Sequence, residues 1–232
     1  MEHIDKVPGT FDRRVQEGKS VVPAAVIKRL PRYYRCLGDL IRDGRMRISS
    51  KELSEIMEVT ASQIRQDLNC FGGFGQQGYG YNIKYLFQKI SELLGVAEGY
   101  NAVIVGAGNL GRALAATHMF ERRGVTRIAL FDSDPEVIGT EVCGLPVLPV
   151  EELTEFSKSH NVKIGVLTVP KEAAYDVACK MAEGGILGIW NYANMELKIP
   201  YPDVIVENVH LGDSLMTLSY EIRCKTREAE NG

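Results

Sequence analysis

Residues 102–115, AVIVGAGNLGRALA, carry the strongest structural signal in the chain. Four apolar residues typical of a buried strand lead directly into Gly106, Gly108 and Gly111, which have the spacing G-x-G-x-x-G. Glycines at this spacing permit a tight turn and let the backbone approach a phosphate group closely. A helix is expected to follow over residues 112–120. The pattern predicts the first strand, turn and helix of a Rossmann-like dinucleotide-binding unit.

A second apolar run, residues 128–131, ends at Asp132, which lies 21 residues after Gly111. An acidic side chain at such a distance hydrogen-bonds the ribose hydroxyls of the adenosine in dinucleotide-binding folds. Ser133 and Asp134 follow, and no Arg or Lys stands there to hold a 2′-phosphate, so the sequence favours NAD(H) over NADP(H). The residues predicted to contact the cofactor at this end are Gly106, Ala107, Gly108, Asn109, Leu110, Gly111 and Asp132.

Alternating strand and helix patterns continue beyond Asp132. Strands are predicted over residues 164–169, 186–190 and 204–206, with a helix ending near Glu183. Ligands of such sheets bind at the carboxyl ends of the strands. Residues at these ends are therefore candidates for the nicotinamide end of the site, with an ordinary loop position as the alternative for each. They are Val169, Pro170, Asn191 and Tyr192.

The charge of the chain changes sign along its length. Within a net charge of −3, residues 1–85 carry 14 Lys and Arg against 10 Asp and Glu, whereas residues 86–232 carry 13 against 20. A basic amino-terminal third on an acidic body indicates nucleic-acid binding at one end and a different ligand at the other.

Two helix-start signals follow one another closely in the basic region. Ser49 with Glu52 forms one capping box, and Thr60 with Gln63 forms another, each followed by apolar residues at helical spacing. A longer helix is expected before them, with Pro31 in its first turn. Two short helices joined by so short a turn predict a helix-turn-helix.

The second short helix is predicted to read DNA bases. Its outer face carries hydrogen-bonding side chains that suit base edges in the major groove, although a polar surface helix is the alternative. Basic side chains on the preceding helix would contact phosphates. The residues predicted to contact DNA in this region are Lys28, Arg29, Arg32, Arg35, Lys51, Ser62, Gln63, Arg65, Gln66 and Asn69.

A glycine-rich segment, FGGFGQQGYGYNI, occupies residues 71–83. Its glycines and interleaved aromatic residues indicate a tight hairpin, the wing of a winged helix, with a flexible linker as the alternative. Gly78 and Tyr79 in this wing are further candidates for DNA contact. Asn82 is expected to cap a helix that runs to Gly95 and joins the two parts of the chain.

The carboxy-terminal helix has two alternative locations. It is expected from about Asp213 and carries Leu215, Leu218 and Ile222, which pack either on the chain's own sheet or against a second copy. A winged helix that reads a palindrome requires a dimer. The predicted organisation is α/β: a flexible tail at 1–20, a winged-helix DNA-binding domain at 21–85, a linker helix at 86–99, a Rossmann-like NAD(H)-binding domain at 100–210 and a terminal dimerisation helix at 211–232.

Composition is typical of soluble globular proteins, with 45% hydrophobic and 25% charged residues. The five cysteines and four histidines are dispersed and lack metal-ligand spacing. No run reaches the ~18 apolar residues of a membrane helix, and residues 1–20 lack the apolar core of a signal peptide. We therefore expect a cytoplasmic protein with neither a metal nor a membrane partner.

Two classes of function fit a dinucleotide site beside a DNA-binding motif: a dehydrogenase with an extension, and a transcription factor that senses a dinucleotide. A hydride-transfer enzyme needs a proton donor near the nicotinamide. His118, His160 and His210 stand in no recognisable catalytic pattern, and no separate substrate domain follows the cofactor domain. The sensor is therefore favoured, with no catalytic residue and no protein substrate.

Several runs together resemble the Rex family of redox-sensing transcriptional repressors. They are VPAAVIKRLPRYYRCLGDL, RISSKELSEIMEVTASQIRQDLNCFGGFG, GYGYN, GAGNLGRALA, FDSDPEVIG, LTVPKEAA and GILGIWNYAN, and the resemblance covers nearly all of residues 22–220. It implies a homodimer joined by an exchanged carboxy-terminal helix. It further implies binding to double-stranded operator DNA with an inverted repeat, and dissociation from it when NADH binds.

The resemblance also implies a switch contact from which this sequence departs. In the family an Arg of the first helix is linked to a Tyr after the glycine motif and to an Asp before the last helix. Here Arg35 is present, but Thr117 and His210 stand at the other two positions. A Thr–His contact is the hypothetical replacement, with a pH dependence from the histidine. The residues expected in the switch and dimer contacts are Arg35, Thr117, His210, Leu211, Leu215 and Leu218.

Overall fold

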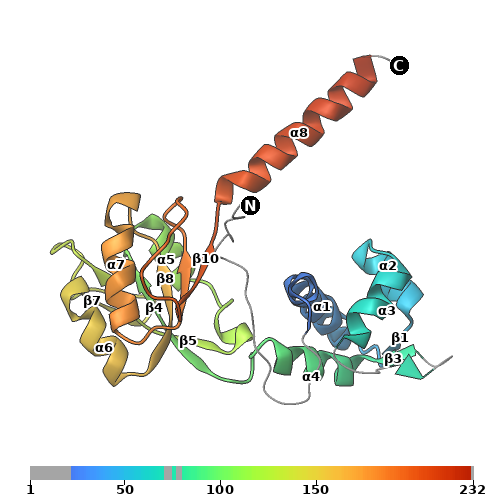
Figure 1. Ribbon diagram of the computed structural model, residues 1–232, viewed down its shortest axis with the longest axis horizontal. Coiled ribbons are helices and arrows are strands. Elements are labelled where there is room, and N and C mark those ends of the chain that lie inside the picture. The colour runs from blue at the N-terminus through green and yellow to red at the C-terminus, as the bar shows by residue number, and fades with distance from the viewer. Residues whose placement is uncertain (1–21, 71–74, 77–79, 231–232) are drawn as a thin grey trace, which may run out of the picture. The chain divides into compact units, whose positions relative to one another are not determined.

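The computed structural model describes residues 22–70, 75–76 and 80–230 (Figure 1). The chain divides into two compact units, residues 1–97 and residues 98–232. The tail expected at 1–20 lies outside the described residues.

The first unit has the architecture of a winged helix. Its strands pair antiparallel in the order β1-β3-β2, so that Tyr81 on the central strand faces Ile48 on one side and Gly75 on the other. Apolar side chains from four helices share one core. The elements are α1 (Ala24–Arg42), β1 (Arg47–Ile48), α2 (Ser50–Met57), α3 (Ala61–Asn69), β2 (Gly75–Gln76), β3 (Gly80–Asn82) and α4 (Ile83–Leu93).

Capping side chains start α2 and α3 where the sequence predicts. The Ser49 hydroxyl accepts a hydrogen bond from the backbone N–H of Glu52 at 3.1 Å, and the Glu52 carboxylate accepts one from the N–H of Ser49 at 2.9 Å. Hydrogen bonds to its carboxylate from the backbone N–H and hydroxyl of Ser49 and from Arg45 lower the pKa of Glu52 to about 2. The Thr60 hydroxyl accepts from the N–H of Gln63 at 3.1 Å. The predicted helix-turn-helix is therefore present.

α1 begins earlier than the sequence predicts. Its first residue is Ala24, so Pro31 lies inside the helix rather than in its first turn. A proline at such a position costs a backbone hydrogen bond. A buried apolar stripe nevertheless runs from Val26 to Leu40 across this point, while Pro31 faces solvent. Burial of the stripe holds the helix together across the proline.

α4 is part of the first unit's core. Asn82 caps it as predicted, by accepting from the N–H of Tyr85 at 3.0 Å. Leu86 and Ile90, within the segment expected to be a linker helix, are fully buried in the same core as α1. The prediction of a separate linker helix at 86–99 is therefore wrong, and the two units divide between residues 97 and 98.

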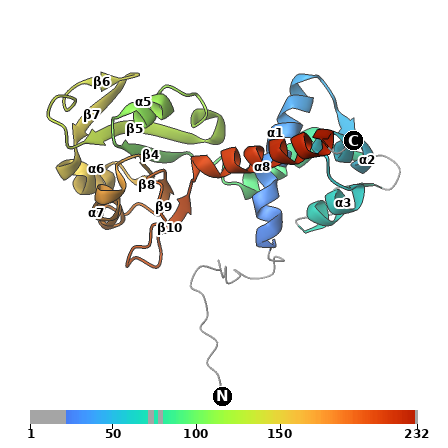
Figure 2. The ribbon, with the colours of Figure 1, turned by 90° about the horizontal axis from the view of Figure 1, so that it is seen from above.

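The second unit is a Rossmann-like sheet with helices on both faces. In the described part of the chain its strands lie in the order β10-β9-β8-β4-β5-β7-β6, all parallel except the β6–β7 hairpin. α5 lies on one face, and α6 and α7 cover the other (Figure 2). The elements are β4 (Tyr100–Val105), α5 (Asn109–Ala115), β5 (Val125–Asp132), β6 (Glu141–Val142), β7 (Leu145–Pro149), α6 (Leu153–Ser159), β8 (Val162–Leu167), α7 (Lys171–Glu183), β9 (Gly188–Asn191) and β10 (Ile205–Asn208).

α5 is shorter than predicted: it ends at Ala115, whereas the sequence predicts a helix to Phe120. The Thr117 hydroxyl donates to the carbonyl of Leu114 at 3.0 Å, and the Arg127 guanidinium donates to the carbonyl of Ala115. The Arg127 guanidinium thus satisfies a carbonyl group at the end of the helix that lacks a helical partner.

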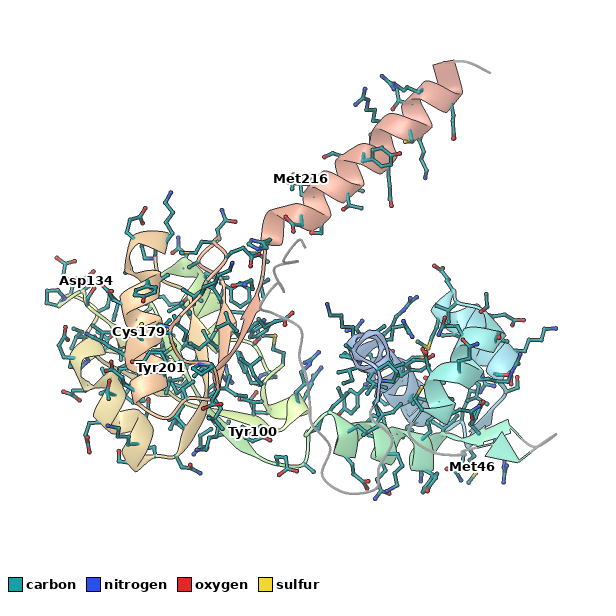
Figure 3. All side chains as sticks on the ribbon, viewed as in Figure 1. Met46, Tyr100, Asp134, Cys179, Tyr201 and Met216 are labelled. Atoms are coloured by element: carbon teal, nitrogen blue, oxygen red, sulfur yellow. The ribbon has the colours of Figure 1, made fainter. Side chains whose placement is uncertain are left out.

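α8 (Leu211–Glu230) leaves the sheet after β10 and extends away from it (Figure 1). Its large apolar side chains are exposed, with Leu211 63%, Leu215 64% and Leu218 51% accessible. Met216 on the same helix stands clear of the side chains of the sheet (Figure 3). The alternative in which this helix packs on its own sheet is therefore wrong. Among the described residues, no helix is both long and apolar enough to cross a membrane.

Candidate nucleotide site and DNA-binding surface

The three glycines between β4 and α5 have different environments. Gly106 has a φ of +103°, and a Cβ atom there would lie 2.7 Å from the carbonyl oxygen of Thr168. A Cβ atom on Gly111 would lie 1.8 Å from the carbonyl oxygen of Gly106. A Cβ atom on Gly108 would meet nothing within 4 Å. Packing therefore requires the first and third glycines, and the second leaves open space against the backbone, as a pyrophosphate requires.

Thr168 holds the glycine loop in place. Its hydroxyl, just after β8, lies 2.9 Å from the carbonyl oxygens of both Val105 and Gly106, to which it donates. Sequence reasoning selects the neighbouring Val169 and misses Thr168, because the contact joins residues 62 and 63 positions apart. A small hydroxyl residue directly after a buried parallel strand is the signal that would have indicated it.

Asp132, the last residue of β5, lies beside the loop as predicted. One carboxylate oxygen accepts a hydrogen bond from the N–H of Ala107 at 2.6 Å. The other accepts from the N–H groups of Ser133 at 2.8 Å and Asp134 at 3.0 Å. The carboxylate is thus fixed next to the open space at Gly108. This arrangement fits an adenosine dinucleotide, with the loop backbone holding the pyrophosphate and Asp132 holding the ribose hydroxyls.

At the predicted nicotinamide end of the site, the side chain of Asn191 is hydrogen-bonded to other residues of this chain. It is 1% exposed, and its carbonyl oxygen accepts from the N–H of Ala193 at 2.9 Å. Its amide donates to the carbonyl of Met195 at 2.9 Å and to the side-chain oxygen of Asn208 at 2.8 Å. Asn191 therefore shapes this edge of the sheet rather than presenting a free carboxamide.

The other residues predicted at this end keep some accessible surface. Tyr192 packs edge-on against Trp190, with ring centroids 4.9 Å apart, and burial raises the pKa of the tyrosine. Val169 is partly buried against the core, and Pro170 is exposed immediately before α7. Apolar and aromatic surface thus lies at the same edge as the glycine loop.

α3 presents a polar face to solvent. Ser62, Arg65, Gln66 and Asn69 are exposed along it. The Arg65 guanidinium donates to the hydroxyl of Ser50, on α2, at 3.2 Å. Exposed donors and acceptors on the second helix of a helix-turn-helix suit the edges of bases in a major groove.

The inner side of α3 carries a buried carboxylate, Asp67, which is 1% exposed. Arg29 donates to it through Nε at 2.7 Å and through Nη2 at 2.6 Å. The hydroxyl of Tyr33 donates at 3.0 Å, and the amide of Gln63 donates at 2.7 Å. Burial acts to raise the pKa of Asp67, but these hydrogen bonds outweigh it and lower the pKa. Sequence reasoning missed this carboxylate, which ties α3 to α1.

The buried carboxylate involves two of the residues predicted to contact DNA. Arg29 and Gln63 are both hydrogen-bonded to Asp67, so both hold the inner side of α3 in place. The remaining predicted basic residues, Lys28, Arg32, Arg35 and Lys51, are exposed. Arg32 and Arg35 also line a cavity of about 510 Å³ between α1 and α2. The predicted wing residues Gly78 and Tyr79 lie outside the described residues.

Within the described chain, Thr117 and His210 do not form the hypothetical replacement contact. Thr117 donates to the carbonyl of Leu114, as described above. The Nε2 atom of His210 lies 3.1 Å from a carboxylate oxygen of Glu196. His210 therefore pairs with a carboxylate of its own unit.

A winged helix with an exposed polar recognition helix, joined to a sheet whose glycine loop fits a dinucleotide, defines a transcription regulator with a nucleotide-binding unit. Comparison with known proteins agrees with this class. A family model described as a putative DNA-binding protein N-terminus matches residues 21–69, and one described as a CoA binding domain matches residues 97–195.

Individual relatives are similar over most of the chain. A protein named Redox-sensing transcriptional repressor Rex from Caldanaerobacter subterraneus subsp. tengcongensis is 50% identical over 204 residues, 88% of this chain and 91% of its own. A crystal structure of RSP with beta-NAD+ and operator DNA matches with a TM-score of 0.83 and 47% identity, covering 91% of this chain and 97% of that one. RSP with beta-NADH matches with a TM-score of 0.83 and 43% identity, covering 92% and 100%.

The chain belongs to the Rex family of redox-sensing transcriptional repressors. Its relatives are named as repressors, so the dehydrogenase alternative is set aside, and the Rossmann-like unit is the NAD-binding part of a regulator.

The environments of Gly108 and Gly111 predict that substitution by alanine affects NADH binding at the first position and stability at the second. Gly111→Ala places a Cβ atom against the Gly106 carbonyl and should lower the free energy of unfolding of the second unit by about 3 kcal/mol or more. Gly108→Ala has room and a permitted φ of −75°. It should leave stability nearly unchanged but weaken NADH binding at least roughly tenfold, because the methyl group fills the space against the backbone. Urea unfolding and isothermal titration calorimetry measure the two effects.

The Asp67 contacts predict that Arg29 and Arg32 differ in role. Arg29→Gln leaves a buried carboxylate without its ion pair and should lower the free energy of unfolding by about 3 kcal/mol. Arg32→Gln should leave stability unchanged and reduce the salt dependence of DNA binding by about one unit of slope. Urea unfolding, and DNA binding across a salt series, separate the two. A lower salt slope with unchanged stability for Arg29→Gln would instead make Arg29 a phosphate contact.

Proposed function

We propose that this chain is a cytoplasmic homodimeric repressor that binds inverted-repeat operator DNA and releases it when NADH binds. In this proposal Ser62, Arg65, Gln66 and Asn69 read bases. Phosphates are contacted by Lys28, Arg32, Arg35 and Lys51, with Gly78 and Tyr79 of the wing as further contacts indicated by the sequence.

The observation that carries the proposal is the shared edge of the sheet. β4, β8, β9 and β10 are parallel, so their carboxyl ends lie along one edge. The glycine loop follows β4, and α8 begins at Leu211, shortly after β10 ends at Asn208. A dinucleotide held at this edge therefore lies on the side of the sheet from which α8 leaves. The ligand site and the start of α8 are therefore attached to the same edge of the sheet.

α8 supports a dimer, because its apolar residues have no partner in the described chain. Leu211, Leu215, Leu218 and Ile222 are spaced by four, three and four residues, which places them on one face of the helix. All four are more than half exposed. A monomer rarely exposes a continuous apolar face of this kind. A second copy supplies the same face in return, as two-fold symmetry requires.

Discrimination between NADH and NAD⁺ follows from the charge of the nicotinamide. NAD⁺ carries a positive charge on that ring and NADH does not. Burying a cation that has no counterion against apolar walls is costly, and the surface offered by Val169 and Tyr192 is apolar and aromatic. We therefore expect NADH, rather than NAD⁺, to favour the released form.

The proposal is tested by operator binding at fixed salt, using an operator selected from random duplexes by the purified protein. Saturating NADH should weaken binding roughly 100-fold, which corresponds to about 2.7 kcal/mol of coupling. NAD⁺ at the same concentration should leave the operator bound. Fluorescence anisotropy of a labelled duplex gives both affinities. Unchanged operator affinity at saturating NADH would contradict the proposal.

Two ligands serve as controls in the same titration. NADPH should act only at much higher concentration, because the Asp132 carboxylate repels a 2′-phosphate. Coenzyme A shares the adenosine and diphosphate of NADH but lacks the nicotinamide. It should compete weakly and leave the operator bound.

The dimer is tested by a charge placed on α8. Leu215→Glu should give a monomer in analytical ultracentrifugation and should weaken operator binding, because two half-sites are then bound independently. Thr217→Glu is the matched control, since it adds the same charge on a different face of the same turn. It should remain a dimer with unchanged operator affinity. A dimeric Leu215→Glu protein would place the interface elsewhere.

A further inference from the structure

Polar side chains at the base of α8 form a connected set of hydrogen bonds. The set runs from Asn191, at the end of β9, through Asn208, at the end of β10, to Glu196 and His210. We call these four residues the edge network. It belongs neither to the glycine loop nor to the recognition helix, and it begins at the edge of the sheet where the nicotinamide end of the site is expected.

Asn208 is the centre of the edge network. Its side-chain oxygen accepts from the amide of Asn191 at 2.8 Å and from the backbone N–H of Leu197 at 3.3 Å. Its amide donates to a carboxylate oxygen of Glu196 at 3.0 Å. One carboxamide therefore bonds the end of β9 at Asn191 and the following segment at Glu196 and Leu197.

The inner end of the edge network shapes the segment after β9. Asn191 holds the backbone of Ala193 and Met195 through its own carboxamide. Tyr192, the residue in between, donates its N–H to the carbonyl of Leu167 at 2.8 Å and packs on Trp190. A ligand that displaces Tyr192 therefore moves residues bonded to Asn208.

The outer end of the edge network leads into α8. Glu196 accepts from Asn208 with one oxygen, and its other oxygen lies 3.1 Å from Nε2 of His210. The carbonyl of His210 in turn accepts from the N–H of Asp213, in the first turn of α8, at 3.2 Å. The N–H of Val209 donates to the carbonyl of Asn191 at 2.8 Å. Side-chain and backbone bonds together tie the start of the helix to the end of β9.

These bonds matter because, among the described residues, α8 has no apolar packing on its own unit. A helix that buries a face against a sheet is held in direction by that face, whereas the apolar residues of α8 are exposed. Within the described chain, the contacts that relate α8 to its own sheet are therefore those of residues 208–210, which lie between β10 and the helix. The edge network supplies the side-chain contacts there.

We infer that Asn208 is the positioning residue that couples occupation of the ligand site to the direction of α8. The inference rests on the proposed function above. Displacement of the segment after β9 by NADH is transmitted through the Asn208 carboxamide to Glu196 and His210, and so to the first turn of α8. The carboxamide suits this task because it accepts from Asn191 and donates to Glu196 at once.

The test measures coupling separately from binding. Asn208→Asp keeps the size and the acceptor but loses the donor and places a negative charge beside Glu196. NADH affinity is followed through the fluorescence of Trp190, the single tryptophan of the chain, which directly precedes Asn191. Operator affinity is measured with and without saturating NADH. We expect NADH affinity and NADH-free operator affinity to stay within about threefold of the wild type, while the release ratio falls roughly tenfold.

Two further variants complete the experiment. Glu196→Ala removes the outer half of the edge network from an exposed position, so the variant should fold, and it too should lower the release ratio. Tyr201→Phe is the matched control. Tyr201 lies beside α7 (Figure 3), and its hydroxyl donates to Glu183 at 3.0 Å. This bond holds the segment between β9 and β10 at a point outside the edge network. This control should keep the wild-type release ratio.

Three outcomes overturn the inference in distinguishable ways. A wild-type protein that NADH does not release would end the proposed function, and the inference with it. If NADH releases the wild type, and Asn208→Asp and Glu196→Ala both keep the wild-type release ratio, the inference alone is overturned. Loss of thermal stability with both affinities reduced and the ratio unchanged would make Asn208 a structural residue only.

Discussion

The parallel alignment of β4, β8, β9 and β10 is the constraint on which the second unit depends. Because parallel strands end at one edge, this alignment places the glycine loop, Thr168, Asn191 and the start of α8 along a single line of the sheet. Contacts too close for any side chain hold Gly106 against Thr168, just after β8, and Gly111 against Gly106. A ligand bound at this edge therefore lies on the side of the sheet from which the exposed helix α8 begins.

In the first unit the buried carboxylate of Asp67 fixes the orientation of α3. A carboxylate removed from water is costly unless it is fully hydrogen-bonded. Asp67 meets that requirement through Arg29, Tyr33 and Gln63, two of which lie on α1. A different packing of α3 would leave the carboxylate unpaired, so the network specifies which face of α3 is outward. The exposed side chains that would read DNA owe their orientation to this buried one.

Predictions from the sequence succeed where the physical cause is local. The capping box of Ser49 and Glu52 acts over three residues, and the glycine spacing reports backbone freedom within one turn. Predictions are wrong where a distant partner decides. α1 continues across Pro31 because its apolar stripe is buried by other helices, and α4 becomes part of a core instead of a linker for the same reason. α5 ends at Ala115, earlier than predicted, and its last carbonyl is taken by Arg127 of a later strand.

The sequence by itself therefore determines the class of each unit, the glycine loop with Asp132 beside it, and the polar character of the recognition helix. These are properties of short segments, set by steric freedom, capping and periodicity. Only the tertiary structure decides that Arg29 and Gln63 bind a buried carboxylate and that Thr168 holds the loop. It also decides that Asn208 joins β9 to the base of α8 and that the apolar side chains described on α8 stay exposed. Each of these depends on contacts between residues far apart in the chain, whose free energy exists only once the fold has brought them together.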